Sequence, residues 1–186
     1  MRLSELMDEK TILLSLKGKK KAEMLEEMVE CLSKAGILEN KKEFLSSILE
    51  REELESTALG GGVAIPHGRS SGVKKLTVLF ARDKNGVDFQ ALDRKPVHYI
   101  FMIAAPKDVR KEYLQAIAKV ARLLKSELMK KRLMEVNREK ELMDTIRDFD
   151  RLVPERIEVK TKEGKFVEAQ SEYAGGCPTK NCPFPG

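Results

Sequence analysis

The stretch Val97-His98-Tyr99-Ile100-Phe101-Met102-Ile103-Ala104 decides the class of fold. Its nearly continuous run of apolar and β-branched side chains is typical of a strand that is covered on both faces. Pro106 follows and ends the strand. Beyond it, apolar side chains recur every three or four residues and predict a helix: Tyr113, Leu114, Ile117, Ala118, Ala121 and Leu124.

The residues before this strand continue the alternation of strands and helices. Three further strands are expected, at residues 11–16, 63–65 and 76–81. Asn85-Gly86 is typical of a tight turn between the third of these strands and the stretch that starts at Val97.

The predicted helices fill the remaining intervals. One covers residues 22–35 and is ended by Gly36. The next begins at Asn40, which resembles a capping box with Glu43, and frays through Arg51-Glu52-Glu53. Two more are expected near residues 127–136 and 139–148. Strands and helices thus alternate over the first 150 residues, so the class is α/β.

Composition argues against several classes of function. The 186 residues carry 35 Lys and Arg against 30 Asp and Glu, and the net charge of +5 is spread thinly. Aromatic residues make up 5% with no Trp, so the basic stripe with interleaved aromatics of a nucleic-acid binder is missing. No apolar run approaches the roughly 20 residues that span a bilayer. The N-terminus does not resemble a secretion signal, and three cysteines cannot all pair, so a cytoplasmic location is expected.

The character of the chain changes near residue 151. We therefore expect one domain at 1–150 and an extension at 151–186, with a small exposed hairpin between Ile157 and Glu168 and an irregular tail. The tail carries Cys177 and Cys182. These thiols could form half of a metal site or a reversible disulfide, although two ligands are too few for a closed zinc site. Disorder or simple packing is the alternative.

His67 is the candidate reactive residue. It follows a short strand and Pro66 and lies just past the triplet Gly60-Gly61-Gly62, whose backbone N–H groups could surround an anion. Arg51 and Arg69 could face the same anion. Neighbouring cations lower the pKa of an imidazole and keep a lone pair available for attack on a phosphoryl group. His98, inside an apolar strand, is interpreted as structural.

A wider pattern surrounds His67. Residues 59–68, Leu-Gly-Gly-Gly-Val-Ala-Ile-Pro-His-Gly, resemble the active-site segment of the enzyme IIA family of the sugar phosphotransferase system, in its fructose/mannitol and nitrogen-regulatory branch. Arg51-Glu52 lies sixteen residues before the histidine, as the family's arginine does, and Ser56-Thr57 lies in the expected loop. The resemblance covers about residues 3–149.

This resemblance implies a phosphotransferase relay component without metal or other cofactor. His67 would accept a phosphoryl group at Nε2 from a phosphorylated histidine carrier protein. It would pass the group to a cysteine or histidine of an enzyme IIB partner, which loads sugar at a membrane permease. Arg51 would steady the phosphoryl oxygens, and the fold would be a mixed sheet flanked by helices on both faces. The further phosphoryl-binding residues would be Gly60, Gly61, Gly62, Thr57, Gly68, Arg69 and Tyr113.

Tyr113 departs from the family pattern, because the family usually carries a second histidine at this position. A phenol can donate one hydrogen bond to a phosphoryl oxygen but cannot become cationic. The tyrosine therefore leaves open a relative that has lost phosphoryl transfer. Independently of Tyr113, a regulatory module that signals through the phosphorylation state of His67 is the second alternative to a transport role.

Two smaller features were weighed as sites. Asp88 and Asp93 could pair as acid and base, although single acids on turns are common. The basic run from Lys17 to Lys21 could bind an acidic partner, but we interpret it as a solvated loop at a helix start.

Overall fold

A computed structural model describes residues 1–58, 60–153, 157–160 and 166–169 of the chain. The chain divides into two compact units, Met1–Leu152 and Val153–Gly186. The first unit contains a five-stranded sheet and five α-helices among its described residues, and the second contains two strands.

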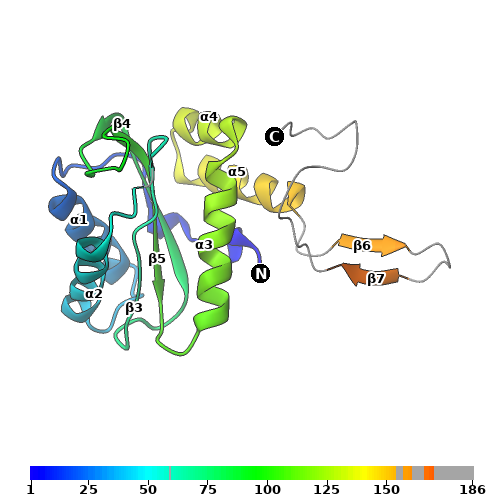
Figure 1. Ribbon diagram of the computed structural model, residues 1–186, viewed down its shortest axis with the longest axis horizontal. Helices are drawn as coiled ribbons and strands as arrows, with labels where there is room; N and C mark the ends of the chain where they lie inside the picture. Colours follow the sequence, from blue (N-terminus) through cyan, green and yellow to red (C-terminus); the bar gives the residue numbers. More distant parts are fainter. Residues whose placement is uncertain (59, 154–156, 161–165, 170–186) are drawn as a thin grey trace. The chain divides into compact units, whose positions relative to one another are not determined.

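The sheet of the first unit is mixed (Figure 1). Its central pair, β4 (Thr77–Val87) and β5 (Val97–Ala105), is antiparallel. The strand β1 (Ile12–Leu13) runs parallel to β4, and the short strands β2 (Val63–Ala64) and β3 (His67–Arg69) both run parallel to β5. The predicted α/β class and the mixed sheet are confirmed.

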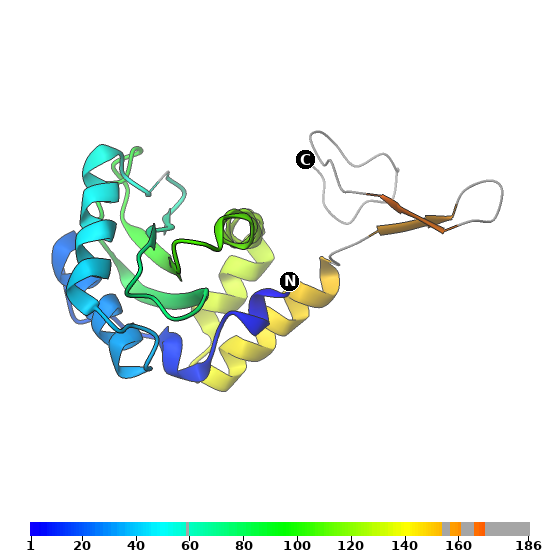
Figure 2. The same cartoon turned by 90° about the horizontal axis from the view of Figure 1, so that it is seen from below.

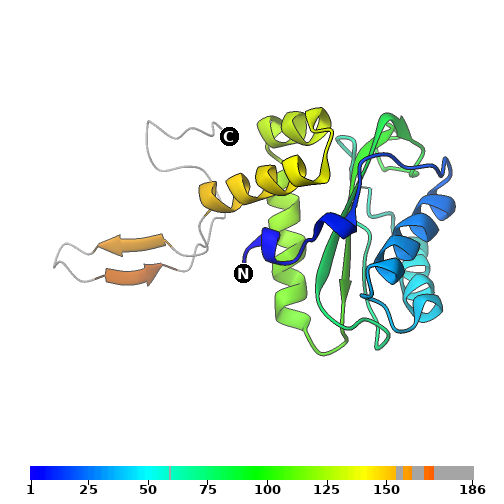
Figure 3. The same cartoon turned by 180° about the vertical axis from the view of Figure 1, so that it is seen from behind.

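Helices lie on both sides of this sheet. The five are α1 (Lys21–Lys34), α2 (Lys41–Leu54), α3 (Arg110–Leu124), α4 (Glu127–Glu135) and α5 (Glu139–Leu152). Figures 1 and 2 show α1 and α2 against one face of the sheet and α3 against the other. Figure 3 shows the N-terminal segment beside α5, where the N–H groups of Leu3 and Ser4 donate to the Asp150 carboxylate at 2.8 Å each.

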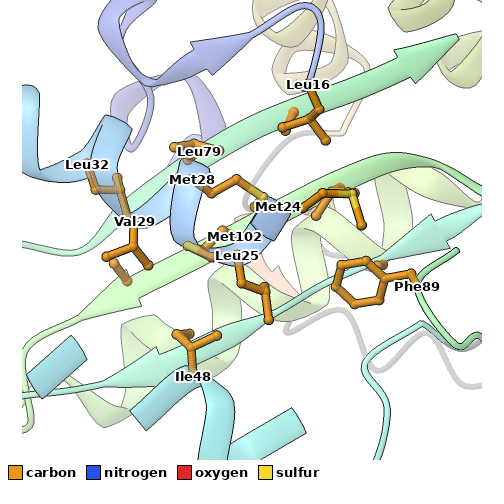
Figure 4. Packing of buried hydrophobic residues seen from close by; sticks show 14 of the residues in the cluster. Leu16, Met24, Leu25, Met28, Val29, Leu32, Ile48, Leu79, Phe89 and Met102 are labelled. Carbon is orange, nitrogen blue, oxygen red and sulfur yellow. The ribbon is translucent and has the colours of Figure 1, made fainter. Parts of the chain in front are cut away.

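The main core lies between the sheet and the pair α1 and α2. Met24, Leu25 and Met28 of α1 are fully excluded from solvent, as are Leu79 of β4 and Met102 of β5. Figure 4 shows these side chains interleaved with Ile48 of α2 and with Phe89. Burying each large apolar side chain contributes roughly 1.5–3 kcal/mol, so this layer fixes how α2 sits on the sheet.

One edge of the sheet is interrupted where it matters for the site. Val63 and Ala64 pair with Tyr99 and Ile100, and His67 pairs with Ile103 in the same register, so β2 and β3 form one line along β5. The break falls at Ile65-Pro66, because proline has no N–H to donate. Hydrogen bonding to β5 continues across the break, because the Pro66 carbonyl accepts from Ile103 N–H at 2.9 Å. His67 is therefore held at a fixed place on this edge.

Two expectations about local structure were wrong. The strand expected at 11–16 is limited to Ile12–Leu13, because residues 9–11 form a 3₁₀ turn that Asp8 caps and the chain bends at residues 14–15. Asn85-Gly86 is not a tight turn. The strand β4 continues through it to Val87, with a register shift between Arg82 and Val87 that accommodates Gly86 at a φ of 77°.

Two expectations about charged segments were also wrong. The helix α2 does not fray at Arg51-Glu52-Glu53 but continues to Leu54, and Glu52 is buried. The run Lys17 to Lys21 is not solvated throughout, because Lys21 begins α1 and its ammonium forms an ion pair with Glu52. Glu52 is buried and Lys21 is partly buried, and their contact joins two helices, so the periodicity of either helix alone did not reveal it.

Replacing Gly86 with alanine is expected to cost about 2–4 kcal/mol of unfolding free energy. A Cβ at this position would lie 2.6 Å from Pro96 Cβ and 2.8 Å from His98 Cε1, in a backbone conformation that L-residues avoid. Gly36→Ala is the matched control, since Gly36 has a φ of 75° and nothing within 4 Å of the added Cβ. Urea unfolding of both variants measures the difference. Equal losses would show that the bulge is not tightly packed.

The second unit holds an antiparallel strand pair, β6 (Ile157–Lys160) and β7 (Phe166–Ala169). The pair occurs where alternating residues predicted a hairpin. The connection at 161–165 and the expected irregular tail at 174–186, with Cys177 and Cys182, lie outside the described residues.

Candidate functional site

His67 is the first residue of β3, and its ring is half-buried. Its Nδ1 lies 2.6 Å from the carbonyl oxygen of Ile65. A carbonyl oxygen can only accept a hydrogen bond, so Nδ1 carries the proton and donates it. The lone pair of the neutral ring is then on Nε2. The backbone of the interrupted strand thus selects the tautomer whose Nε2 is a nucleophile.

The surroundings keep this imidazole uncharged. Burial is the largest influence and lowers the pKa of His67 below its ordinary value of 6.5. The hydrogen bond to Ile65 raises this pKa, the Arg51 charge lowers it, and the Glu52 charge raises it. Because the net result is a lowered pKa, the ring is neutral near pH 7 and its Nε2 lone pair is available.

The lowered pKa predicts a dependence of stability on pH. Between the folded-state pKa and 6.5, the unfolded chain binds a proton that the folded chain does not. This contribution to stability is present above about pH 6.5 and is lost as the pH falls from 6.5 through the folded-state pKa. From about pH 7.5 to about 5.5, wild type should therefore lose more unfolding free energy than His67→Gln. An equal loss in both proteins, measured by urea unfolding, would contradict a buried, neutral His67.

Arg51 lies in the last turn of α2 and is half-buried. Its Nη1 donates to the carbonyl oxygen of Glu55 at 3.0 Å. Its charge reaches His67, since it contributes to the lowered pKa of the ring. A guanidinium presents five N–H donors in a planar fork, a geometry that suits phosphoryl oxygens.

Tyr113 lies beside His67, and Arg69 makes a cation–π contact with the Tyr113 ring. The Tyr113 ring, on α3, has its centroid 5.9 Å from that of His67 at an interplanar angle of 55°. The Arg69 guanidinium carbon lies 5.6 Å from the centroid of the Tyr113 ring, and Nη1 of Arg69 donates to the Lys107 carbonyl at 3.1 Å. Burial raises the pKa of the Tyr113 phenol, so it keeps its proton and can act as a donor. The structure brings His67, Arg51, Arg69 and Tyr113 to one place.

The glycine triplet has backbone contacts of its own, and its predicted binding of the phosphoryl group stays a prediction. Gly60, Gly61 and Gly62 all have positive φ, and Gly61 N–H donates to the Asp93 carboxylate at 3.0 Å. The Gly62 carbonyl accepts from His98 and Tyr99 N–H groups at the start of β5, whereas His67 pairs with Ile103, four residues along that strand. At about 3.3 Å of rise per residue, the backbone positions of Tyr99 and Ile103 lie about 13 Å apart along β5.

Thr57 and Gly68 make contacts within the frame around the imidazole, and their predicted phosphoryl-binding role stays a prediction. The Thr57 hydroxyl donates to the buried Glu52 carboxylate, and the Thr57 carbonyl accepts from Ile65 N–H at 3.2 Å. At Gly68, an added Cβ would lie 3.0 Å from Ile48 Cδ1 and from Ser47 Oγ of α2. A side chain at this position would therefore have to displace Ile48 or Ser47, because β3 packs closely on α2 here.

The pair Lys21 and Glu52 was missed by the sequence analysis. Lys21 Nζ lies 2.5 Å from Glu52 Oε2, and the two side chains are only 16% and 4% exposed. The sequence offered one signal, namely an acid at the end of a helix with a threonine five residues later. Such pairs are too common to be distinguished from solvated residues.

Asp88, Asp93 and His98 have structural contacts. Asp88 accepts from Gln90 N–H, while Asp93 accepts from Lys95 and Gly61 N–H groups, so the two acids have separate backbone partners. Nδ1 of His98 lies 3.1 Å from the Asp83 carbonyl oxygen, in agreement with its structural interpretation.

Two absences concern the described part of the chain. Over residues 1–58, 60–153 and the two strands beyond, no group of three or more His, Cys, Asp and Glu side chains is arranged to hold a metal ion. Within those same residues, no helix is long and apolar enough to cross a membrane.

Taken together, the fold and the site define an α/β domain that presents a neutral histidine with a nucleophilic Nε2 beside a guanidinium. Residues 5–149 match the family described as "Phosphoenolpyruvate-dependent sugar phosphotransferase system, EIIA 2", and the chain belongs to this family. It is thus a member of the enzyme IIA phosphocarriers, the phosphoryl relay components of the system, which are grouped with the transferases.

Relatives from both branches of the family are similar to the chain. A fructose-specific EIIABC component of Bacillus subtilis is 37% identical over 81% of this chain, and the chain spans only 24% of that relative's length. A nitrogen regulatory protein of Bradyrhizobium diazoefficiens is 36% identical over 72% of this chain and 86% of the relative.

Solved structures agree in fold. The nitrogen regulatory protein IIA-Ntr from Neisseria meningitidis has a TM-score of 0.71 at 33% identity and covers 77% of this chain and 97% of its own. The mannitol enzyme IIA from Escherichia coli, solved in complex with phosphorylated mannitol enzyme IIB, has a TM-score of 0.65 at 27% identity. That match covers 77% of this chain and 99% of the solved one.

Proposed function

We propose that Nε2 of His67 accepts a phosphoryl group from a phosphorylated histidine carrier protein and passes it to an enzyme IIB for sugar uptake. The observation that carries the proposal is the hydrogen bond from Nδ1 of His67 to the Ile65 carbonyl, at 2.6 Å. It leaves the lone pair on Nε2, and Arg51 stands near enough to influence the ring. In this proposal Arg51 stabilises the phosphoryl oxygens, while Arg69 and the Tyr113 hydroxyl are further donors.

The chemistry balances without a cofactor. The bond between Nε2 of His67 and phosphorus forms as the bond between the carrier's ring nitrogen and phosphorus breaks, and the electron pair returns to the carrier's ring. The proton on Nδ1 of His67 stays in its hydrogen bond to Ile65, which leaves the phosphorylated ring cationic. A cationic ring is a good leaving group, so the same contact prepares the second transfer. The protein's part is in-line placement and charge stabilisation.

A regulatory role is the second candidate. The nitrogen regulatory relative is almost as similar to this chain as the fructose-specific one, at 36% against 37% identity. In this alternative, the phosphorylation state of His67 is a signal read by a target protein, and no transporter is fed.

The mannitol enzyme IIA solved with its enzyme IIB supports an enzyme IIB-type partner for this chain.

The two roles are separated by a two-stage transfer experiment. The purified chain is first incubated with the phosphorylated histidine carrier protein and weighed by intact-protein mass spectrometry, which should show a gain of one phosphate mass. Candidate enzyme IIB proteins are then added. Loss of the mass from this chain and its appearance on an enzyme IIB supports the transport role. Stable retention with every enzyme IIB favours the regulatory role, and no gain at all contradicts both.

The setting of the reaction is part of the proposal. We place the transfer in the cytoplasm, as the membership of the enzyme IIA family suggests. Neither a metal, a cofactor nor a nucleic acid takes part in it.

Phosphoryl acceptance is expected to reside in the first unit alone. We propose that the functional domain is the predicted 1–150 segment, extended to Leu152 because α5 ends there. A chain shortened after Leu152 should melt within a few degrees of the full chain and gain phosphate at the same rate. Thermal unfolding and the mass assay measure both quantities. An insoluble or inert short chain would show that the extension is required.

A further inference from the structure

The buried ion pair of Lys21 and Glu52 is connected to the candidate site by an unbroken series of contacts. Lys21 Nζ contacts Glu52 Oε2 at 2.5 Å, and the other Glu52 oxygen accepts from the Thr57 hydroxyl. The Thr57 carbonyl accepts from Ile65 N–H at 3.2 Å. The Ile65 carbonyl in turn accepts from Nδ1 of His67 at 2.6 Å. The series therefore joins the start of α1 and the end of α2 to the imidazole.

Stability alone does not account for this pair. Bringing two charges out of water costs several kcal/mol per ion, so a buried ion pair is weak evidence for added stability. Glu52 is further bound by Thr57, whose N–H donates to Oε1 at 3.2 Å and to Oε2 at 3.3 Å. Lys21 and Thr57 together thus fix the position of the Glu52 carboxylate. Such fixing is expected of a charge that acts on a neighbouring group.

The charged and titratable groups that face His67 come from three elements. The helix α2 contributes Arg51 and Glu52, α3 contributes Tyr113, and β3 itself contributes Arg69 next to Tyr113. Of these, Arg51 and Glu52 are adjacent in sequence and opposite in charge, and both act on the imidazole. Lys21 is linked to His67 through its ion pair with Glu52.

We propose that Glu52 is a positioning residue of the site. Through Thr57 and Ile65 it holds Nδ1 of His67, and its charge offsets that of Arg51 at the imidazole. Lys21 limits the size of that offset by neutralising part of the Glu52 charge.

The consequence for transfer rests on the function proposed above. Phosphorylation at Nε2 leaves the ring cationic while its Nδ1 proton stays in place. The nearby Glu52 carboxylate stabilises this cation, whereas Arg51 destabilises it and attracts the phosphoryl oxygens instead. Glu52 therefore favours the state from which the phosphoryl group leaves.

The proposal is tested on the unphosphorylated protein by following the His67 ring through a pH titration with NMR. Two variants break the same ion pair from opposite sides. In Glu52→Gln the anion that favours the imidazolium is lost, so the midpoint of His67 should fall. In Lys21→Met the Glu52 charge is no longer offset, so the midpoint should rise. Glu53→Gln, which removes an exposed acid one residue away, should leave the midpoint unchanged.

A purely structural ion pair gives a different result, because both variants would then lose stability and shift the midpoint alike or not at all. Opposite shifts in folded variants support the proposal, and shifts of the same sign, or none, overturn it. If Glu52→Gln does not fold, Lys21→Met decides alone: a rise supports the proposal, and an unchanged or lower midpoint overturns it. No carrier protein is used, so the result stands even if the transfer assay fails.

Discussion

Replacing His67 with glutamine is expected to abolish the gain of phosphate from the phosphorylated carrier protein. The amide has no nucleophilic nitrogen, because its lone pair is delocalised into the carbonyl, while its size and polarity suit the half-buried position. Intact-protein mass spectrometry over a time course measures the gain. The expected loss is complete, since no other residue in the proposal forms a bond to phosphorus.

His98→Gln is the matched control, because the chain has only two histidines. His98 contacts the Asp83 carbonyl and lies beside Gly86, away from the cluster around His67. Its replacement should leave phosphate gain at the wild-type rate. Full phosphorylation of His67→Gln, or loss of phosphorylation in His98→Gln with the fold intact, would refute the assignment of His67.

Replacing Arg51 with alanine is expected to slow phosphate gain by about 10²–10³-fold, the typical effect of removing one donor that faces developing charge. The change also removes the cation that lowers the pKa of His67, so this pKa should rise and less of the ring should be neutral at pH 7. Stopped-flow or quenched-flow phosphorylation measures the rate. Arg51→Lys, which keeps the charge but loses the planar fork, should lie between wild type and alanine.

Stability is the control for this variant. The side chain of Arg51 donates one hydrogen bond, to the Glu55 carbonyl near the end of α2, and such a bond contributes about 0.5–1.5 kcal/mol. The melting temperature of Arg51→Ala should therefore fall by a few degrees at most. A wild-type transfer rate, or a large loss of stability, would show that Arg51 is structural.

The fold was predictable wherever one strong local pattern decides a segment. The apolar run that became β5 and the helical spacing that became α3 each specify their structure without help from distant residues. The N-cap role of Asn40 is of the same kind, and the structure confirms it through the hydrogen bond from Glu43 N–H at 3.1 Å. The other half of the predicted capping box is wrong, because the Glu43 carboxylate accepts from Ser70 and Ser71 instead.

Long-range packing decided the segments that were predicted wrongly. Asn85-Gly86 has the composition of a hairpin turn, but pairing with β5 carries β4 through it as a bulge. Glu52 belongs to a charged run at a helix end, and only the approach of α1 buries it against Lys21. Lys21 lies far outside the window of about 11–18 residues over which local periodicity acts, and the pairing of β4 with β5 is a contact that periodicity does not describe.

The candidate site also contains some residues that a local pattern predicts and others whose contacts depend on long-range packing. His67 and Arg51 were accessible from the sequence because the glycine, proline and histidine of one short segment carry a family resemblance. Gly68 and Thr57 are predicted to bind the phosphoryl group, and the structure adds that Gly68 permits close packing on α2 and that Thr57 binds Glu52. Packing of the frame and binding of a ligand favour the same residue types, so the sequence alone does not separate these two roles.

The most direct test of the account locates the phosphorus atom. The chain, labelled with ¹⁵N in its histidines, is phosphorylated by the carrier protein and observed by ¹⁵N and ³¹P NMR. We expect phosphorus bonded to Nε2 of His67, with the proton retained on Nδ1. Phosphorus on Nδ1 of His67, on His98 or on any other side chain would contradict the account.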